Sequence, residues 1–367
     1  MSKYSPLHQY HQGAGAKLAD FGGWEMPIEY PATNGGGVLN EHRAVRETVG
    51  LFDVSHLGKV SVTGPGALDY LNSIFTNDLN RISDGQAQYT LICDDSSGGV
   101  IDDLIAYRYS EEEIFLIPNA ANTSEVVRRL SESAPAGIVI TNLHEHHAVM
   151  ALQGPQSRAV LSALGVNSNL DYMSFEESKI SGVKVILCRT GYTGELGYEI
   201  LAKWGDAPMV WDALLDAVER LGGRAAGLGA RDTLRTEMGY PLHGHELSLE
   251  ITPVQAGSTW AVGWKKETFR GSEALRAEKE AGPRRILRGL QSTDRGIPRA
   301  GMDVKNSDGK VIGVITSGTF SPSLKKGIAL ALVEPVYVVG DSVVVDVRGR
   351  ESIAQVVALP MVESHVR

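Results

Sequence analysis

Hydrophobic and polar positions alternate in some parts of the chain and recur at helical spacing in others. Between residues 51 and 144, strand-like segments are interleaved with two segments of helical spacing, 64–75 and 122–133. Two apolar segments flank the polar turn DDSSGG at 94–99, which predicts a hairpin. Strands, a helix, a hairpin, a strand and a second helix in this order predict a compact α+β unit.

The segments on either side of that unit follow other patterns. Residues 182–202 predict two strands around a glycine-rich turn, and residues 206–223 predict an amphipathic helix. Beyond residue 285, short strands follow one another at regular spacing, which predicts a small barrel or sandwich. The pattern therefore changes near residues 51, 145 and 285.

Composition and charge narrow the class of protein. The 367 residues carry a formal net charge of −9, and the sequence contains no basic cluster. A nucleic acid or an anionic membrane as the main partner is therefore not expected, because both need a concentrated positive patch. The two cysteines, Cys93 and Cys188, are expected to be buried thiols rather than a disulfide framework. We find no signal-peptide pattern and no 18-residue apolar run, so we expect a cytoplasmic protein.

The stretch GGVIDDLIAY at 98–107 places two carboxylates inside an aliphatic segment. Carboxylates are costly in such surroundings unless they are hydrogen-bonded or paired. On a strand, Asp103 shares one face with Tyr107, and Asp102 lies on the other face. The two acids therefore cannot form a same-face acid and base pair of the glycosidase kind. Each is either a satisfied structural group or a functional one.

Other stretches suggest binding without settling it. RTGYTGELGYEI at 189–200 has the glycines of a tight hairpin or of a ligand turn, and it does not match the dinucleotide fingerprint. Arg231, in GLGARD, either contacts a carboxylate or another anion or has a structural role. Histidines gather at 144–147 and 243–246, where a solvated polar turn is favoured over a metal site because the spacing matches no ligand set.

Several motifs in this order resemble one family over nearly the whole chain. They are GAGAKLADFGGWEMPIEY, HRAVRETVGLFDVSHLGKVSVTGPGA, GGVIDDLIAY, ALQGP, TGYTGELGYEI, GLGARDTLR, ITPVQAGSTWAV and ITSGTFSPSLKKGIALALV. The chain resembles the T protein of the glycine cleavage system, a tetrahydrofolate-dependent aminomethyltransferase. The resemblance implies a three-domain α+β fold. A discontinuous folate-binding domain (1–50 and 145–280) would carry an inserted α+β domain (51–144), followed by a C-terminal β-barrel-like domain (285–367).

The resemblance also assigns roles to residues. Asp103 matches the catalytic carboxylate, which leaves Asp102 as a structural group. Glu199 matches the residue that holds the polar edge of the pterin ring. The other matching folate-pocket positions are Tyr89, Tyr107, Asn119, Tyr192, Arg231 and Tyr240. The chain departs from the family pattern at Leu57, commonly Met, and at His243 and His245.

The implied reaction takes an aminomethyl group from the lipoyl arm of H protein, releases ammonia and forms 5,10-methylene-tetrahydrofolate. The system also contains P and L proteins, and the reaction needs no metal. A basic patch drawn from Lys265, Lys266, Arg270, Lys325 and Lys326 is expected to dock H protein. A folate-dependent demethylase on the same fold is the alternative. A folate-binding relative of iron–sulfur assembly is disfavoured because TGYTGELGYEI lacks that group's cysteine.

Overall fold

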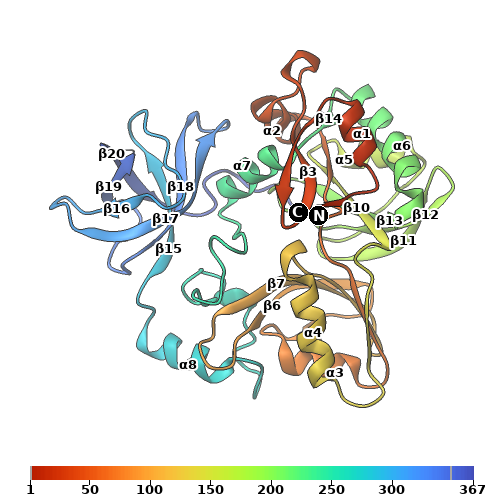
Figure 1. Ribbon diagram of the computed structural model, residues 1–367, viewed down its shortest axis with the longest axis horizontal. Helices are drawn as coiled ribbons and strands as arrows, with labels where there is room; N and C mark the ends of the chain where they lie inside the picture. Colours follow the sequence, from red (N-terminus) through yellow and green to blue (C-terminus); the bar gives the residue numbers. More distant parts are fainter. Residues whose placement is uncertain (1, 348) are drawn as a thin grey trace.

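The computed structural model describes residues 2–347 and 349–367, which form three main units (Figure 1). A six-stranded sheet with its helices, a smaller α+β unit and a closed barrel surround the segment that follows helix α7 (Leu228–Met238). Helix α7 packs against both the barrel strands and helix α2 of the first unit. It therefore connects the barrel to the rest of the molecule.

The first unit contains the six-stranded sheet, of order β11-β12-β13-β10-β4-β14, and a small sheet of order β1-β3-β2. Its strands are β1 (Lys3–Tyr4), β2 (Lys17–Phe21), β3 (Trp24–Glu29), β4 (Gly50–Asp53), β10 (His147–Gln153), β11 (Phe175–Ile180), β12 (Val183–Cys188), β13 (Gly197–Lys203) and β14 (Arg224–Ala225). Its helices are α1 (His8–Gly13), η1 (Ala32–Asn34), α2 (Val38–Glu47), α5 (Ser157–Ala163), η4 (Trp204–Asp206), α6 (Ala207–Arg220) and α7. Trp211 and Leu214 of α6 pack on Met150 and Ile200 of the sheet, which confirms the amphipathic helix predicted there.

The pairing of strand β4 indicates where the inserted unit begins. It pairs with β10 through Leu51 opposite Leu152 and Phe52 opposite Ala151. It therefore belongs to the six-stranded sheet, although it lies after residue 50. We propose that the first unit continues to Asp53 and that the insertion starts beyond it.

The inserted unit is a five-stranded sheet of order β6-β7-β8-β5-β9 with helices on one face. Its elements are β5 (Val60–Thr63), α3 (Ala67–Ile74), η2 (Leu79–Arg81), β6 (Gln86–Cys93), β7 (Val100–Ser110), β8 (Glu113–Ile117), η3 (Ala120–Asn122), α4 (Thr123–Ser133) and β9 (Val139–Asn142). Strands β6 and β7 form the predicted hairpin around the 94–99 turn. Leu71 of α3 and Leu130 of α4 pack with Leu104 and Leu116 of the sheet, so the α+β prediction is confirmed.

A β-bulge changes the expected alternation at the start of β7. Cys93 of β6 pairs with Val100, and the next pair along β7 involves Asp102, so Ile101 is an extra residue. Val100 and Ile101 therefore lie on the faces opposite to those that strict alternation predicts. From Asp102 onward the alternation is regular, and Asp102 and Asp103 point to opposite faces.

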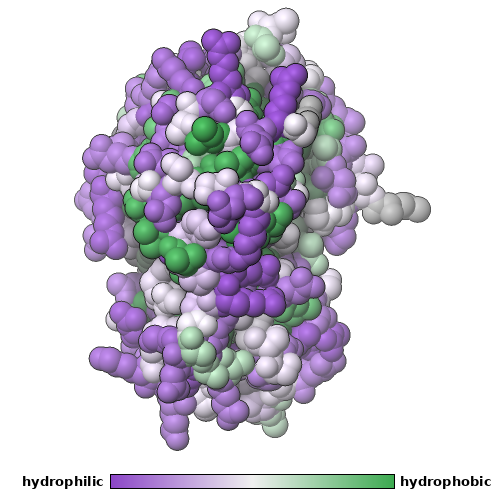
Figure 2. Space-filling model, turned by 90° about the vertical axis from the view of Figure 1, so that its left-hand side faces the viewer, coloured by the Kyte–Doolittle hydropathy of each residue, from purple (hydrophilic) through white to green (hydrophobic). Residues whose placement is uncertain are grey.

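The C-terminal unit is a closed barrel of order β15-β18-β17-β16-β19-β20, which decides between the predicted barrel and sandwich. Its strands are β15 (Ile286–Ser292), β16 (Asp303–Lys305), β17 (Val311–Ser321), β18 (Lys326–Val333), β19 (Ser342–Val347) and β20 (Arg350–Val357). The preceding segment contains η5 (Thr259–Ala261) and α8 (Ser272–Ala281), and it packs between β6 and the barrel. Figure 2 shows the barrel side of the molecule, where scattered hydrophobic patches interrupt a hydrophilic surface. Among residues 2–347 and 349–367, no helix is long and apolar enough to span a membrane.

Candidate active site

Asp103 is held by two neighbours. The hydroxyl of Tyr89 donates to Asp103 Oδ2 at 3.0 Å, and the side-chain amide of Asn119 donates to Asp103 Oδ1 at 2.8 Å. Tyr89 lies opposite Ile105 on the paired strand, so it is the diagonal neighbour of Asp103 on the same face. Asn119 follows β8, the other neighbour of β7. The carboxylate is therefore fixed in orientation from both sides of its strand.

Asp102 has the surroundings of a structural carboxylate. It is 0% exposed, and it accepts hydrogen bonds from the Asn119 backbone N–H at 3.1 Å, Asn119 Nδ2 at 2.9 Å and Asn122 Nδ2 at 2.7 Å. Asn122 precedes helix α4, but its side chain makes no capping bond and turns to Asp102 instead. Asp102 thereby positions Asn119, and Asn119 in turn positions Asp103.

The two carboxylates influence each other's ionisation. Burial raises the pKa of Asp102, and the charge of Asp103 raises it further, against the effect of the asparagine donors. Burial also raises the pKa of Asp103, while Tyr89, the charge of His243 and Asn119 lower it. Burial and Asp103 raise the pKa of Tyr89 well above its ordinary value, which keeps the phenol protonated as a donor. Both acids have donors that favour the charged form, and Asp103 also has the nearby His243, while the charge of Asp103 disfavours ionisation of Asp102.

A second cluster surrounds Glu199. This buried carboxylate on β13 accepts a hydrogen bond from Thr190 Oγ1 at 2.5 Å, and Thr190 Oγ1 lies 3.3 Å from the hydroxyl of Tyr107. Tyr107 is 1% exposed and packs edge-on against Phe175. Tyr107 therefore supports Glu199 through Thr190. Thr190 was not selected from the sequence, although it lies inside the quoted RTGY motif.

Arg231, at the start of α7, lies next to this cluster. Its guanidinium is 4.7 Å from the centroid of the Tyr192 ring. Burial lowers the pKa of Arg231, against the charges of Glu199 and Tyr192. Its buried Nη1 has no hydrogen-bond partner among the described residues, and neither does the buried Nδ1 of His56. Burial and the charge of Arg231 lower the pKa of His56 to about 3, so its ring is neutral.

Two stacked pairs of aromatic rings lie among the candidate site residues. Tyr192 stacks on Tyr240 with the ring centroids 5.7 Å apart, and its hydroxyl donates to the Pro241 carbonyl. Trp260 was not selected from the sequence. It stacks on Tyr89 at 5.2 Å and is 64% exposed. Trp260 therefore stacks on the tyrosine that holds Asp103 and leaves one of its own faces open to a ligand.

The structure agrees only in part with the predicted solvated histidine turns, because His146 and His245 are exposed but His144 is not. His144 is buried, with Nε2 2.8 Å from the His56 carbonyl. His243 Nε2 lies 3.3 Å from the Val100 carbonyl, and His245 Nδ1 lies 2.9 Å from the Thr316 carbonyl. Three of these rings contact backbone carbonyls of other segments, while His146 and His245 remain exposed. In the described parts of the chain, no group of three His, Cys, Asp or Glu residues could hold a metal ion.

The expected basic docking patch is only partly available. The prediction is wrong for Lys266, whose ammonium group donates to the carbonyls of Asn72, Phe75 and Asn77. Arg270 lies 3.4 Å from Asp95 in an ion pair. The remaining candidates are exposed, and they are Lys265, Lys325 and Lys326. Cys93 and Cys188 are free and buried, as predicted.

Comparison with known proteins places this geometry in a family. A family model described as the GCVT N-terminal domain matches residues 7–266, and one described as the glycine cleavage T-protein C-terminal barrel domain matches residues 285–363. An aminomethyltransferase of Parafrankia sp. (strain EAN1pec) is 59% identical over 363 residues, covering 99% of this chain and 98% of the relative. One of Mycobacterium avium (strain 104) is 57% identical over 366 residues, with the same coverage.

A comparison with solved structures agrees with the family matches. The crystal structure of the glycine cleavage system aminomethyltransferase T from Bartonella henselae matches with a TM-score of 0.92 and 35% sequence identity. The match covers 100% of this chain and 99% of that one. The family and three-domain fold class predicted from the sequence are thus confirmed: the chain belongs to the glycine cleavage T-protein family of aminomethyltransferases.

Proposed function

We propose that this protein is the tetrahydrofolate-dependent aminomethyltransferase of a glycine cleavage system. It takes the aminomethyl group from the lipoyl arm of H protein, in a system that also contains P and L proteins. The names of the relatives support this proposal. The observation that carries it is Asp103, a carboxylate fixed by Tyr89 and Asn119 in the same region as Glu199 and Arg231.

The polar atoms near Glu199 fit tetrahydrofolate as the second substrate. The pterin edge presents N–H donors beside a ring acceptor, and the chain offers a buried carboxylate beside a buried guanidinium whose Nη1 has no partner among the described residues. Glu199 accepts from the N–H groups, and Arg231 donates to the acceptor. Tyr192 and Tyr240 supply apolar walls. Thr190 and Tyr107 hold Glu199 in place from behind.

Asp103 acts on the transferred carbon. The overall transfer forms two carbon–nitrogen bonds to the folate and breaks the carbon–sulfur bond to the lipoyl arm and the carbon–nitrogen bond to ammonia. Two protons leave the folate nitrogens, and they end on ammonia and on the lipoyl sulfur. Positive charge develops at the carbon during these steps, and a fixed carboxylate stabilises it. Asp103 is also placed to accept a proton and pass it on.

A donor comparison tests this function. Purified protein is incubated with tetrahydrofolate and either aminomethyl-loaded H protein, a methyl sulfonium compound or an aryl methyl ether. We expect methylene-tetrahydrofolate from the H protein donor alone. Turnover with a methyl donor, and none with aminomethyl-loaded H protein, would show that the chain is a folate-dependent demethylase instead.

A further inference from the structure

A row of basic residues crosses four adjacent strands of the six-stranded sheet. Lys179 of β11 lies directly opposite Lys184 of β12, and Lys203 of β13 lies directly opposite His147 of β10. Between them, the β12–β13 register pairs Val185 with Ala202, so the next position places Lys184 opposite Lys203. Residues opposite one another on antiparallel strands share a face. The four side chains therefore lie in one line on one face.

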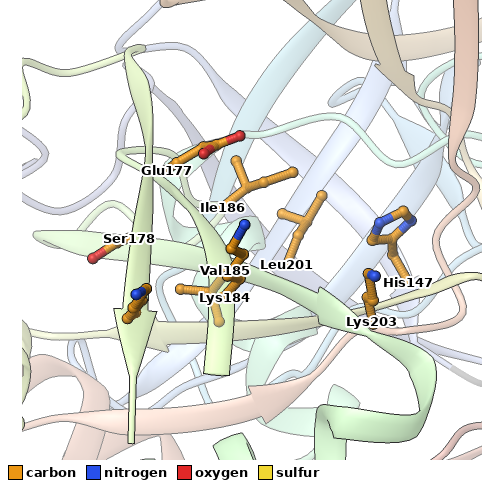
Figure 3. A pocket seen from close by; sticks show the side chains of 9 residues that line it. His147, Glu177, Ser178, Lys184, Val185, Ile186, Leu201 and Lys203 are labelled. Carbon is orange, nitrogen blue, oxygen red and sulfur yellow. The ribbon is translucent and has the colours of Figure 1, made fainter. Parts of the chain in front are cut away.

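This row lines a hollow of about 330 Å³. Figure 3 shows Lys203 beside His147 and the side chains of the neighbouring strands around the same space. Ile186 and Leu201 form an apolar part of the lining, and Glu177 is the carboxylate in it. The volume is within the range of pockets that hold small molecules.

The lysines of this row, Lys179, Lys184 and Lys203, make no ion pair among the described residues, although Glu177 lines the same hollow. Like charges directly opposite on paired strands destabilise a sheet. Lys305 and Lys310 pair with carboxylates, whereas the exposed Lys265, Lys325 and Lys326 form no ion pair among the described residues.

Two further features mark the His147 end of the row. The Nδ1 atom of His147 is buried and has no hydrogen-bond partner within residues 2–347 and 349–367. Burial lowers the pKa of His147, and the charges of Lys59, His146 and Lys203 lower it further. Lys59 is fully buried behind this region and donates to the carbonyls of Ser55 and Leu57, and burial lowers its pKa to about 7 against the charges of Asp53 and Glu145.

We propose that this hollow binds a small anion that carries several phosphate groups. Ammonium groups are point charges that suit phosphate oxygens. Three strand spacings of about 4.8 Å make the row roughly 14 Å long, which matches an extended anion rather than a single phosphate. The apolar lining suits a ligand with an organic body. The concave shape favours a small molecule over the broad surface of an acidic protein.

The site is separate from the one around Asp103. Glu199 and Lys203 lie on the same face of β13, four residues and roughly 13 Å apart. Leu201 lies between them and is buried. Anion binding here does not depend on the proposed aminomethyltransferase activity.

Calorimetry with inorganic tripolyphosphate at low ionic strength tests the proposal. We expect one binding site in the full-length protein, and an affinity at least tenfold weaker in the Lys184→Gln/Lys203→Gln variant. Lys310→Gln, which removes an exposed lysine on the barrel, is the matched control and should bind as the wild type does. The double variant should unfold at a temperature no lower than the wild type without anion, because it loses like-charge repulsion.

Any of three results would overturn the proposal. The first is the absence of tripolyphosphate binding to the wild type, and the second is equal affinity in the double variant. The third is tighter binding of hexaglutamate than of tripolyphosphate, which would identify the row as a surface for acidic protein segments. ATP, measured beside tripolyphosphate, shows whether the organic body adds affinity. Equal affinities would place only the phosphates in the site, and tighter ATP binding would place the base or ribose on Ile186 and Leu201.

Discussion

Replacing Asp102 and Asp103 separately by asparagine should give opposite results, although the two residues are adjacent. Asp103→Asn keeps the shape of the side chain and removes the charge that faces the reacting carbon. Losing one such stabilising group costs about 10²- to 10³-fold in kcat, or roughly 3–4 kcal/mol. Stability should change little, because the amide oxygen can still accept from Asn119 while the Tyr89 hydroxyl, which can rotate, accepts from the amide N–H.

Asp102→Asn is expected to lower the stability of the protein instead. Its carboxylate accepts three N–H bonds from Asn119 and Asn122, and an asparagine would turn its own N–H₂ group toward one of these donors. Each unsatisfied buried donor costs about 1–3 kcal/mol. We therefore expect a loss of roughly 2–3 kcal/mol in the free energy of unfolding. The loss in kcat should be smaller than that of Asp103→Asn, since Asn119 holds Asp103 less firmly.

Two measurements separate these effects. Thermal unfolding gives the midpoint of each variant, and the aminomethyl transfer assay at saturating tetrahydrofolate gives kcat. The reasoning requires a near-normal midpoint with low kcat for Asp103→Asn, and a lowered midpoint with substantial kcat for Asp102→Asn. The reverse pattern would refute the assignment of the two faces of β7.

The remaining predictions concern other parts of the molecule. Glu199→Gln should weaken tetrahydrofolate binding by roughly 1–3 kcal/mol, since a charged acceptor is lost in a buried site; unchanged affinity by calorimetry would remove Glu199 from the site. Burial opposes the ionisation of Asp53, but His11, with two serines, lowers its pKa to about 2 from the ordinary 3.8. This stabilisation is present above the unfolded-state pKa and is lost as pH falls from 3.8 through 2, so Asp53→Asn should flatten the acid limb of the unfolding curve. A variant with an unchanged acid limb would contradict that linkage. Activity should survive dialysis against a strong chelator, and a loss restored only by added metal would count against metal-free chemistry. Reversing Lys325 and Lys326 to Glu should raise KM for H protein and leave turnover of free aminomethyl-lipoamide unchanged; an equal loss with both donors would exclude a docking role.

Local pattern predicts the elements of this fold well. The face of α6, the β6–β7 hairpin and the opposite directions of Asp102 and Asp103 all follow from periodicity, because each depends on neighbours close in sequence. The bulge at Ile101 could not be predicted in this way. It adds one residue without changing the hydrophobic character of the strand.

For the candidate site, the sequence could not predict the contacts between segments that lie far apart in the chain. Nothing in the sequence near Lys266 shows that its ammonium group donates to three carbonyls around α3. In the same way, Trp260 reaches Tyr89 from a segment about 170 residues later in the chain. Periodicity reports which face of an element is buried, and it does not report which element covers that face.

Single turnover of aminomethyl-loaded H protein with tetrahydrofolate tests the role of Asp103 most directly. Ammonia and methylene-tetrahydrofolate are measured together in the wild type and in Asp103→Asn. We expect the wild type to form the two products in equal amounts, and we expect both to appear about 10²- to 10³-fold more slowly in the variant at unchanged folate affinity. A wild-type rate in Asp103→Asn, or ammonia released without methylene-tetrahydrofolate in the wild type, would contradict the proposed mechanism.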